Sequence, residues 1–262
     1  MNSSNILMII AILPVLLLLY YVYKKDPHKE TFGNLIKIFV FGFVSTIPVG
    51  LLEIIFELII HLDKKNYITI FIYVFIGIAL IEEFAKWIII KLSVYNTFRF
   101  DEYYDSIVYC TFVSLGFACL ENISYVISNG IGTGILRAVT SVPGHTCFGI
   151  IMGYYLCYTK FHEIRNNKSY KKYNYLSLLL PVLIHTLYDY FLFTELIGIW
   201  IISYIILVVY CMKIINKVAT QNKPFYETTE NQIPSTMVYC PSCGTPSTTG
   251  GYCVKCGNKL PN

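Results

Sequence analysis

Two adjacent glutamates lie three and four residues before a lysine, in the middle of an apolar stretch of the sequence. They are Glu82 and Glu83, and the lysine is Lys86. In a helix these spacings make neighbours, so the Lys86 ammonium can contact either carboxylate and offset part of the cost of burying it. At least one carboxylate then remains able to take a proton from a water molecule. The spacing favours acid–base chemistry, with the Glu82 and Glu83 pair as the base.

Four more side chains that can bind a metal ion follow in the next three apolar stretches. They are Glu121, His145, His185 and Asp189. His185 and Asp189 are four residues apart, so both can touch one metal ion, or the carboxylate can orient the imidazole. Two imidazoles and several carboxylates suit Zn²⁺ or another divalent metal and leave a carboxylate to activate water. The sequence predicts a metal site formed by these four residues.

Two polar residues could stabilise the oxyanion of such a reaction. Asn122 can donate a hydrogen bond to a substrate carbonyl or can simply link two helices, and Lys86 can act electrostatically. Without a metal, Glu82 and Glu83 could share a proton and activate water directly. A single buried histidine is more often a packing residue than a ligand. Both the metal-dependent and the glutamic mechanism therefore stay open.

The elements that carry these residues are predicted to lie in a lipid bilayer. Of the 262 residues, 55% are hydrophobic and only 14% charged, with a mean hydropathy of +0.57. An ordinary soluble domain is about a quarter charged. The apolar runs are continuous, which disfavours the alternating pattern of a transmembrane β-barrel. The net charge of +4 is too small to favour a nucleic-acid partner.

Seven apolar runs are long enough to cross a hydrocarbon core, which takes roughly 20 residues as a helix. They are Ile6–Tyr23, Leu35–Ile60, Tyr67–Ile90, Tyr104–Ile127, Leu136–Tyr158, Tyr173–Phe193 and Leu196–Met212. One set of connecting loops holds fourteen Lys and Arg residues, and the opposite set holds three, Lys64, Lys65 and Arg137. Because basic residues accumulate on the cytoplasmic side, the chain is predicted to be an all-α polytopic membrane protein with its N-terminus outside and its C-terminus in the cytoplasm.

A second polar stripe lies near the outer end of the second predicted span. It consists of Glu53, Glu57 and His61, at four-residue spacing. Charged groups near the end of a span can reach water, so an aqueous vestibule or the interface is favoured over a second metal site.

The C-terminal part of the chain is polar and contains two cysteine pairs. We expect a transmembrane domain over residues 1–217, a flexible linker over 218–238 and a small cytoplasmic zinc ribbon over 239–262. The pairs are Cys240 with Cys243 and Cys253 with Cys256, each followed by a glycine. Four thiolates at this spacing predict a structural Zn²⁺ site, and the metal would supply the folding energy of so short a segment. The other five cysteines lie in apolar runs and are assigned no role.

Three motifs follow one another on successive predicted helices: Glu82-Glu83-x-x-Lys86, Phe117-x-x-x-Glu121 and His185-x-x-x-Asp189. In this order they resemble the PrsW family of bacterial intramembrane proteases, which is distantly similar to the CAAX prenyl endopeptidase-type membrane proteases. The resemblance covers about residues 32–212. His145 with Gly149 and Gly153 is similar to the histidine helix of that family.

The resemblance implies a protease in the bacterial cell membrane that cuts a peptide bond in or near the membrane segment of another protein. Its substrates would be single-span anti-sigma factors of stress signalling. The family has been described both as metal-dependent and as glutamic. The ribbon lies outside the common core and could dock a cytoplasmic partner. The alternative from the residues alone is a proton-coupled transporter or a sensor, since buried Glu, Asp and His also form proton relays.

Overall fold

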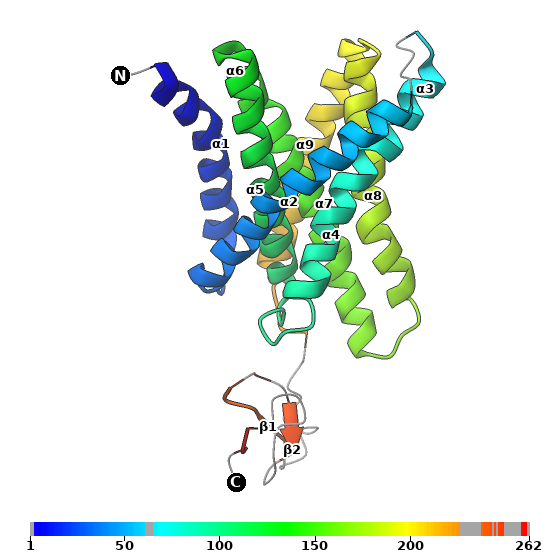
Figure 1. Ribbon diagram of the computed structural model, residues 1–262. Coiled ribbons are helices and arrows are strands. Elements are labelled where there is room, and N and C mark those ends of the chain that lie inside the picture. Colours follow the sequence, from blue (N-terminus) through cyan, green and yellow to red (C-terminus); the bar gives the residue numbers. More distant parts are fainter. Residues whose placement is uncertain are drawn as a thin grey trace.

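The structure, a computed structural model, is a bundle of long helices from one end of which the C-terminal tail extends (Figure 1). It describes residues 3–60, 65–225, 237–242, 244, 246–248 and 258–260. The helices are α1 (Ser3–Lys25), α2 (Phe32–Ile59), α3 (Tyr67–Ile72), the π-helix η1 (Tyr73–Leu80), α4 (Ile81–Ser93), α5 (Tyr103–Asn129), α6 (Ile131–Val139), α7 (Ser141–Ile164), α8 (Tyr170–Phe193) and α9 (Ile197–Thr220). In the tail, β1 (Met237–Tyr239) pairs antiparallel with β2 (Pro246–Thr248).

Seven helical segments of the described chain are long and apolar enough to cross a membrane, which confirms the predicted polytopic all-α bundle. Each overlaps one of the predicted apolar runs, and the largest difference is at α9, which continues to Thr220 instead of ending near Met212. The spans that begin at Tyr67 and at Ile131 each contain more than one helical element. Which end of the bundle faces the cytoplasm stays a prediction.

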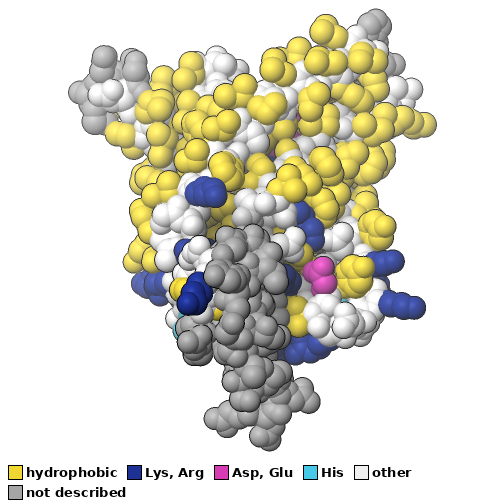
Figure 2. Space-filling view, turned by 60° about the horizontal axis from the view of Figure 1, so that its bottom comes forward, with side chains coloured by type: hydrophobic (Ala, Val, Ile, Leu, Met, Phe, Trp, Pro, Cys, Tyr) yellow, Lys and Arg dark blue, Asp and Glu magenta, His cyan; other side chains and the backbone are white. Residues whose placement is uncertain are grey.

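The outer surface of the bundle is apolar, as a lipid-facing surface must be. Leu17, Leu58 and Ile202, on three different helices, are 59%, 73% and 63% exposed. A water-soluble monomer rarely exposes apolar patches of this extent. Figure 2 shows hydrophobic side chains over much of the bundle and Lys and Arg side chains gathered around the end from which the tail leaves. Apolar walls and a basic rim are the arrangement expected of a bilayer protein.

Helix α5 is the most deeply buried span and packs against α2 and α7. Two glycines of α7 allow its close approach to α5. A Cβ atom at Gly149 would lie 2.8 Å from the carbonyl oxygen of Cys110, and one at Gly153 would overlap the backbone of Ser106. Larger residues would push α7 away from α5. The two glycines thus fix the position of His145, which lies one turn before Gly149 on the same helix.

Two of the spans are interrupted close to the predicted site residues. The third span changes from α3 to the π-helix η1 and then to α4, whose second and third residues are Glu82 and Glu83. The fifth span breaks at Thr140, between α6 and α7, and there the Tyr204 hydroxyl lies within hydrogen-bonding distance of the carbonyl oxygens of Val139 and Thr140 at 2.8 and 3.0 Å. Irregular backbone at membrane depth needs such partners, because lipid offers none.

The first residues of the predicted flexible linker are packed against the bundle. Phe225 is 1% exposed, stacks on Phe100 at 6.0 Å between ring centroids and donates its backbone N–H to the Asp101 carbonyl at 2.6 Å. Asn222 also donates to the Glu102 carboxylate at 2.6 Å. Residues 226–236 lie outside the described residues. The tail is therefore anchored to the loop between α4 and α5 before β1 begins.

The predicted zinc ribbon is described only in part. Cys240 is buried, and Gly244 has φ of +67° and donates its N–H to the Cys240 carbonyl at 2.7 Å. This left-handed conformation explains why a glycine follows the first cysteine pair. Cys243, Cys253 and Cys256 lie outside the described residues, so the zinc site stays a prediction. The five cysteines of the bundle are all buried, as expected of packing residues. They are Cys110, Cys119, Cys147, Cys157 and Cys211.

Candidate active site

The Glu82 and Glu83 pair faces the interior of the bundle and binds Lys86. The Lys86 ammonium lies 3.0 Å from Glu82 Oε2 and 2.7 Å from Glu83 Oε1, and the lysine is 0% exposed. It also lies 4.4 Å from the centroid of the Phe117 ring on α5. These residues begin directly after η1, and π-helical turns are frequent at functional sites. The contacts predicted from the spacing of the three residues are present.

His145 connects this pair to α5. Its Nδ1 lies 3.1 Å from the Lys86 ammonium, and its Nε2 lies 2.9 Å from Glu121 Oε2. Because an ammonium can only donate, Nδ1 must be the acceptor, and Nε2 then carries the hydrogen donated to Glu121. Glu121 therefore orients the imidazole in this arrangement.

His185, on α8, contacts two carboxylates. Its Nδ1 lies 3.0 Å from Glu83 Oε1 and its Nε2 lies 3.3 Å from Asp189 Oδ2. Carboxylates only accept, so the ring donates to both when each nitrogen carries a hydrogen. The His185 ring stacks on Phe148 at 4.5 Å and lies 5.4 Å from the His145 ring. Residues from α4, α5, α7 and α8 thus form one connected buried cluster.

Arg137, which the sequence places only among the basic residues of the outer loops, also belongs to this cluster. Its Nη2 lies 2.9 Å from Glu121 Oε1, and its Nε donates to Asn122 Oδ1 at 3.1 Å. Asn122 in turn donates to the Ala11 carbonyl on α1 at 2.8 Å. Asn122 therefore links α5 to α1 and α6 in this structure. The sequence does contain a signal that Arg137 belongs to the site. Arg137 falls inside the predicted run Leu136–Tyr158, where a charged side chain needs a partner.

Glu53, on α2, also lies near the cluster, within electrostatic range of Glu82 and Glu121. Its Oε1 is buried, and no hydrogen-bond partner for it is present in the described part of the chain. Glu57, one turn further along α2, is exposed, and His61 lies outside the described residues. Of the two described members of the stripe predicted to face a vestibule, Glu53 is the one that lies near the site.

The charged side chains of the cluster differ in exposure. The side chains of Glu83 and Lys86 are 0% exposed, whereas those of Arg137, Asp189 and Glu121 are 14%, 17% and 20% exposed. Arg137 lies on α6 and binds Glu121, and α6 is at the end of the bundle opposite the tail (Figure 1). Arg137, Asp189 and Glu121 are therefore more accessible from outside the bundle than Glu83, whose carboxylate is enclosed.

The cluster contains more acidic than basic charge. Four carboxylates, those of Glu82, Glu83, Glu121 and Asp189, face the two cations Lys86 and Arg137. With neutral imidazoles this leaves two negative charges in a site shielded from water. Buried charge of this kind is compensated by a cation or by protons. A divalent metal ion or protonated histidines would each supply the balance.

The donor atoms that come closest together are not the four predicted as ligands. One oxygen each of Glu82 and Glu83 and one ring nitrogen of His145 all lie within 4.8 Å of one another. This set of two carboxylates and an imidazole suits Zn²⁺, and the second oxygen of Glu83 is buried without a hydrogen-bond partner among the described residues. The Lys86 ammonium contacts the same three side chains, so a metal ion bound there would take over its contacts. Glu121 and Asp189, by contrast, each bind an imidazole.

A comparison with protein families identifies the group to which the chain belongs. The family model described as PrsW family intramembrane metalloprotease matches residues 30–215. This range includes every residue of the cluster described above. The chain belongs to the PrsW family. The resemblance based on three motifs is thereby extended to residues 30–215, and the C-terminal tail lies outside the matched range.

Curated relatives in the PrsW family are similar over most of their length. Protease PrsW of Oceanobacillus iheyensis is 43% identical over 182 residues, which cover 69% of this chain and 80% of the relative. Protease PrsW of Bacillus subtilis is 38% identical over 183 residues, and that of Geobacillus kaustophilus is 37% identical over 185, covering 80% and 77% of those proteins. No solved structure matches the chain. The predictions of an intramembrane protease and of a multi-pass membrane protein in a bacterial cell are confirmed.

Proposed function

We propose that this protein hydrolyses a peptide bond in or near the membrane-spanning segment of another membrane protein, with water activated by the Glu82 and Glu83 pair. The observation that carries this proposal is the state of the two Glu83 oxygens. One is held by Lys86 at 2.7 Å and His185 at 3.0 Å, and the other is buried without a partner among the described residues. A carboxylate fixed through one oxygen leaves the other available to take a proton from water.

The remaining residues hold this carboxylate in place. The Lys86 ammonium can donate three hydrogen bonds. Glu82, Glu83 and His145 accept all three. It would have to give up one contact to stabilise a substrate oxyanion, so we assign it to positioning of the carboxylates. Glu83, once protonated, can return the proton to the leaving amine, and Asp189 orients His185 beside it. Arg137 is partly exposed and lies at the more accessible edge of the cluster, where it can bind a carbonyl or carboxylate of the substrate chain.

A divalent metal such as Zn²⁺ fits the charge and the donor types of the site, with Glu82, Glu83 and His145 as the first residues to hold it. When bound, it would polarise the scissile carbonyl and activate water. Glutamic chemistry without metal is the second mechanism that these residues allow, because adjacent carboxylates can share a proton. A divalent metal would balance the two excess negative charges of the site, as protonated histidines also would.

The substrate class follows from the site and from the family. The cluster lies among apolar spans, so the scissile bond must enter from the membrane or from its outer surface. A single-span protein such as an anti-sigma factor fits this requirement, as the resemblance to the family implies.

The test is cleavage of a tagged single-span substrate co-expressed with the protein. Glu83→Gln is expected to lower the cleavage rate by about two to four orders of magnitude, the usual contribution of a general base. Glu57→Gln is the matched control, because Glu57 is an exposed glutamate on α2, and it is expected to cleave as the wild type does. Glu82→Gln and His185→Ala complete the set. Equal cleavage by all of these variants would exclude the proposed chemistry.

The metal is tested separately from the tail. In the full-length protein, the four tail cysteines Cys240, Cys243, Cys253 and Cys256 are replaced by serine, and the zinc content of the purified protein is measured. We expect about one zinc per chain to remain and to be lost with Glu83→Gln. Zinc-free protein that cleaves at the wild-type rate would instead establish the glutamic mechanism. Two zinc ions in the unaltered protein would also support the structural zinc proposed for the ribbon.

A further inference from the structure

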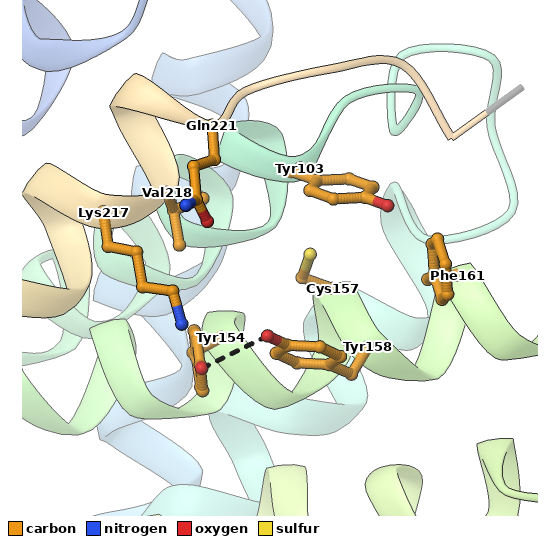
Figure 3. A pocket seen from close by; sticks show the side chains of 8 residues that line it. All are labelled: Tyr103, Tyr154, Cys157, Tyr158, Phe161, Lys217, Val218 and Gln221. Carbon is orange, nitrogen blue, oxygen red and sulfur yellow. Dashed lines mark hydrogen bonds between the residues drawn. The ribbon is translucent and has the colours of Figure 1, made fainter. Parts of the chain in front are cut away.

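A small cavity lies at the end of the bundle from which the tail leaves, remote from the Glu82 and Glu83 cluster. It has a volume of about 80 Å³ and is bounded by the last turns of α7 and α9 and the first residue of α5 (Figure 3). The side chains that bring nitrogen or hydroxyl groups to its wall are Tyr103, Tyr154, Tyr158, Lys217 and Gln221. A single water molecule needs roughly 15 Å³, so the cavity can take a larger polar group.

The wall of the cavity is rich in hydrogen-bond donors and contains no carboxylate among its lining residues. The hydroxyls of Tyr154 and Tyr158 lie 3.3 Å apart, and the side chains of Lys217 and Gln221 also line the cavity (Figure 3). An ammonium and phenolic hydroxyls together form the short, charge-assisted hydrogen bonds that anionic oxygens accept. The chemistry of the wall therefore matches an oxyanion and not a cation.

Two more basic side chains lie over aromatic rings that line the cavity. The Lys223 ammonium is 5.7 Å from the Tyr103 ring centroid, and the Arg165 guanidinium is 3.8 Å from the Phe161 ring centroid. Together with Lys217 in the wall, three cations therefore lie in the wall or against rings that line it. The carboxylate of Asp105 lies within electrostatic range of Cys157 in the wall, but it accepts the backbone N–H groups of the turn before α5. The local field thus favours a ligand with negative charge.

The position of the cavity indicates where such a ligand comes from. Lys217, Lys223 and Arg165 belong to the loops and helix ends that carry most of the basic residues, the side predicted to face the cytoplasm. The inner leaflet presents anionic phospholipid headgroups at this level, and basic pockets between helices are known to bind them. We propose that the cavity binds the phosphate of an anionic phospholipid headgroup, with Lys217, Tyr154 and Tyr158 as its ligands. This site is independent of the proposed catalytic chemistry.

A bound headgroup would touch the segment that anchors the tail. Tyr103, in the wall, also packs against Phe225 at 5.1 Å between ring centroids and donates its N–H to the Lys223 carbonyl at 3.2 Å. Lipid in the cavity would therefore stabilise the docked position of residues 222–225.

The experiment measures lipid binding to the purified full-length protein by native mass spectrometry in detergent. Phosphatidylglycerol and phosphatidylcholine with the same acyl chains are compared, and inorganic phosphate is added as a soluble competitor. We expect the wild type to bind phosphatidylglycerol roughly tenfold or more tightly than phosphatidylcholine, as charge-assisted hydrogen bonds allow. Inorganic phosphate in moderate excess is expected not to displace it. Displacement would identify soluble phosphate as the ligand and overturn the lipid assignment.

Two variants and one control separate the cavity from general surface charge. Lys217→Gln is expected to remove most of the preference for phosphatidylglycerol over phosphatidylcholine. The double variant Tyr154→Phe with Tyr158→Phe is expected to do the same without changing the net charge. Lys213→Gln removes the same charge one turn earlier on α9, from a residue that is exposed like Lys217 but is not among those lining the cavity, and is expected to keep the preference for phosphatidylglycerol. Equal losses for Lys213→Gln and Lys217→Gln, or an unchanged preference in the tyrosine variant, would contradict the proposal. The tyrosine variant still decides the question if Lys217→Gln does not fold.

Discussion

Replacing Lys86 by methionine tests whether the buried ion pairs hold the cluster together. Methionine keeps the apolar length of the side chain but removes the ammonium from Glu82 at 3.0 Å and from Glu83 at 2.7 Å. Lys86 and Glu83 are both 0% exposed, so water cannot take over the lost contacts. Removing one partner of a buried pair costs about 3–5 kcal/mol, because the other charge is left uncompensated.

The measurement is thermal denaturation of the purified protein in a mild detergent. For a domain of this size, each kcal/mol corresponds to about 2–4 °C in Tm, so Lys86→Met is expected to lower Tm by about 6–20 °C. Lys91→Met is the matched control on the same helix. The Lys91 ammonium contacts the Tyr95 ring at 3.3 Å, and its loss is expected to cost about 1 kcal/mol.

A double variant shows that the loss comes from a stranded charge. Adding Glu83→Gln to Lys86→Met removes the most deeply buried carboxylate left without its cation. The double variant is therefore expected to be more stable than Lys86→Met alone, with a coupling energy above about 1 kcal/mol. If Lys86→Met melts within a few degrees of Lys91→Met, or if the two substitutions simply add, the ion pairs do not stabilise the cluster and this reasoning is refuted.

Four further predictions follow from other contacts. Zn²⁺ is expected to raise the Tm of Lys86→Met more than that of the wild type, because the three donors no longer bind an ammonium; an equal shift would place the metal elsewhere. Arg137→Gln is expected to lower the free energy of unfolding by about 1–3 kcal/mol through loss of the ion pair at the outer edge of the cluster, measured by the same melt. Glu102 beside His28 raises the pKa of that exposed imidazole above 6.5. The stabilising contribution of this contact is fully present below about pH 6.5 and is lost as the pH rises through the raised pKa, and an NMR titration in which Glu102→Gln leaves the imidazole pKa unchanged would contradict it. Phe225→Ala is expected to release the docked segment, so that its amide hydrogens exchange about a hundredfold faster while the exchange of the bundle core stays unchanged.

Much of the site could be predicted from the sequence, because ionisable groups at membrane depth are costly. Glu82, Glu83 and Lys86 were identified together by spacing alone, since the neighbours of a residue on its own helix are fixed by helical geometry. The same rule paired His185 with Asp189, and both contacts are present in the structure. Contacts within one helix depend only on local structure, and the sequence encodes them directly.

Contacts between helices could not be predicted in this way. The sequence grouped Glu121 with the histidines as ligands of one ion and left Asp189 either as a ligand or as the partner that orients His185; in the structure each carboxylate contacts one imidazole. Arg137 and Glu53 were assigned to the outer side, and the structure brings both to the cluster. The break at Thr140 has a local signal in Pro143, which lies in the first turn of α7, but the packing of α2 against α5, on which the position of Glu53 depends, has none.

By itself, the sequence determined the bilayer as the solvent, the seven spans and the identity of the residues that must meet inside them. These properties depend on hydrophobicity and on helical spacing, which are sums over near neighbours in the chain. Only the tertiary structure decided which carboxylate binds which cation, that the Lys86 ammonium contacts the three side chains whose donor atoms come closest together, and that Phe225 anchors the tail to the bundle. These depend on angles and distances between helices far apart in the chain, set by close contacts such as those of Gly149 and Gly153, where a single methyl group would be too large.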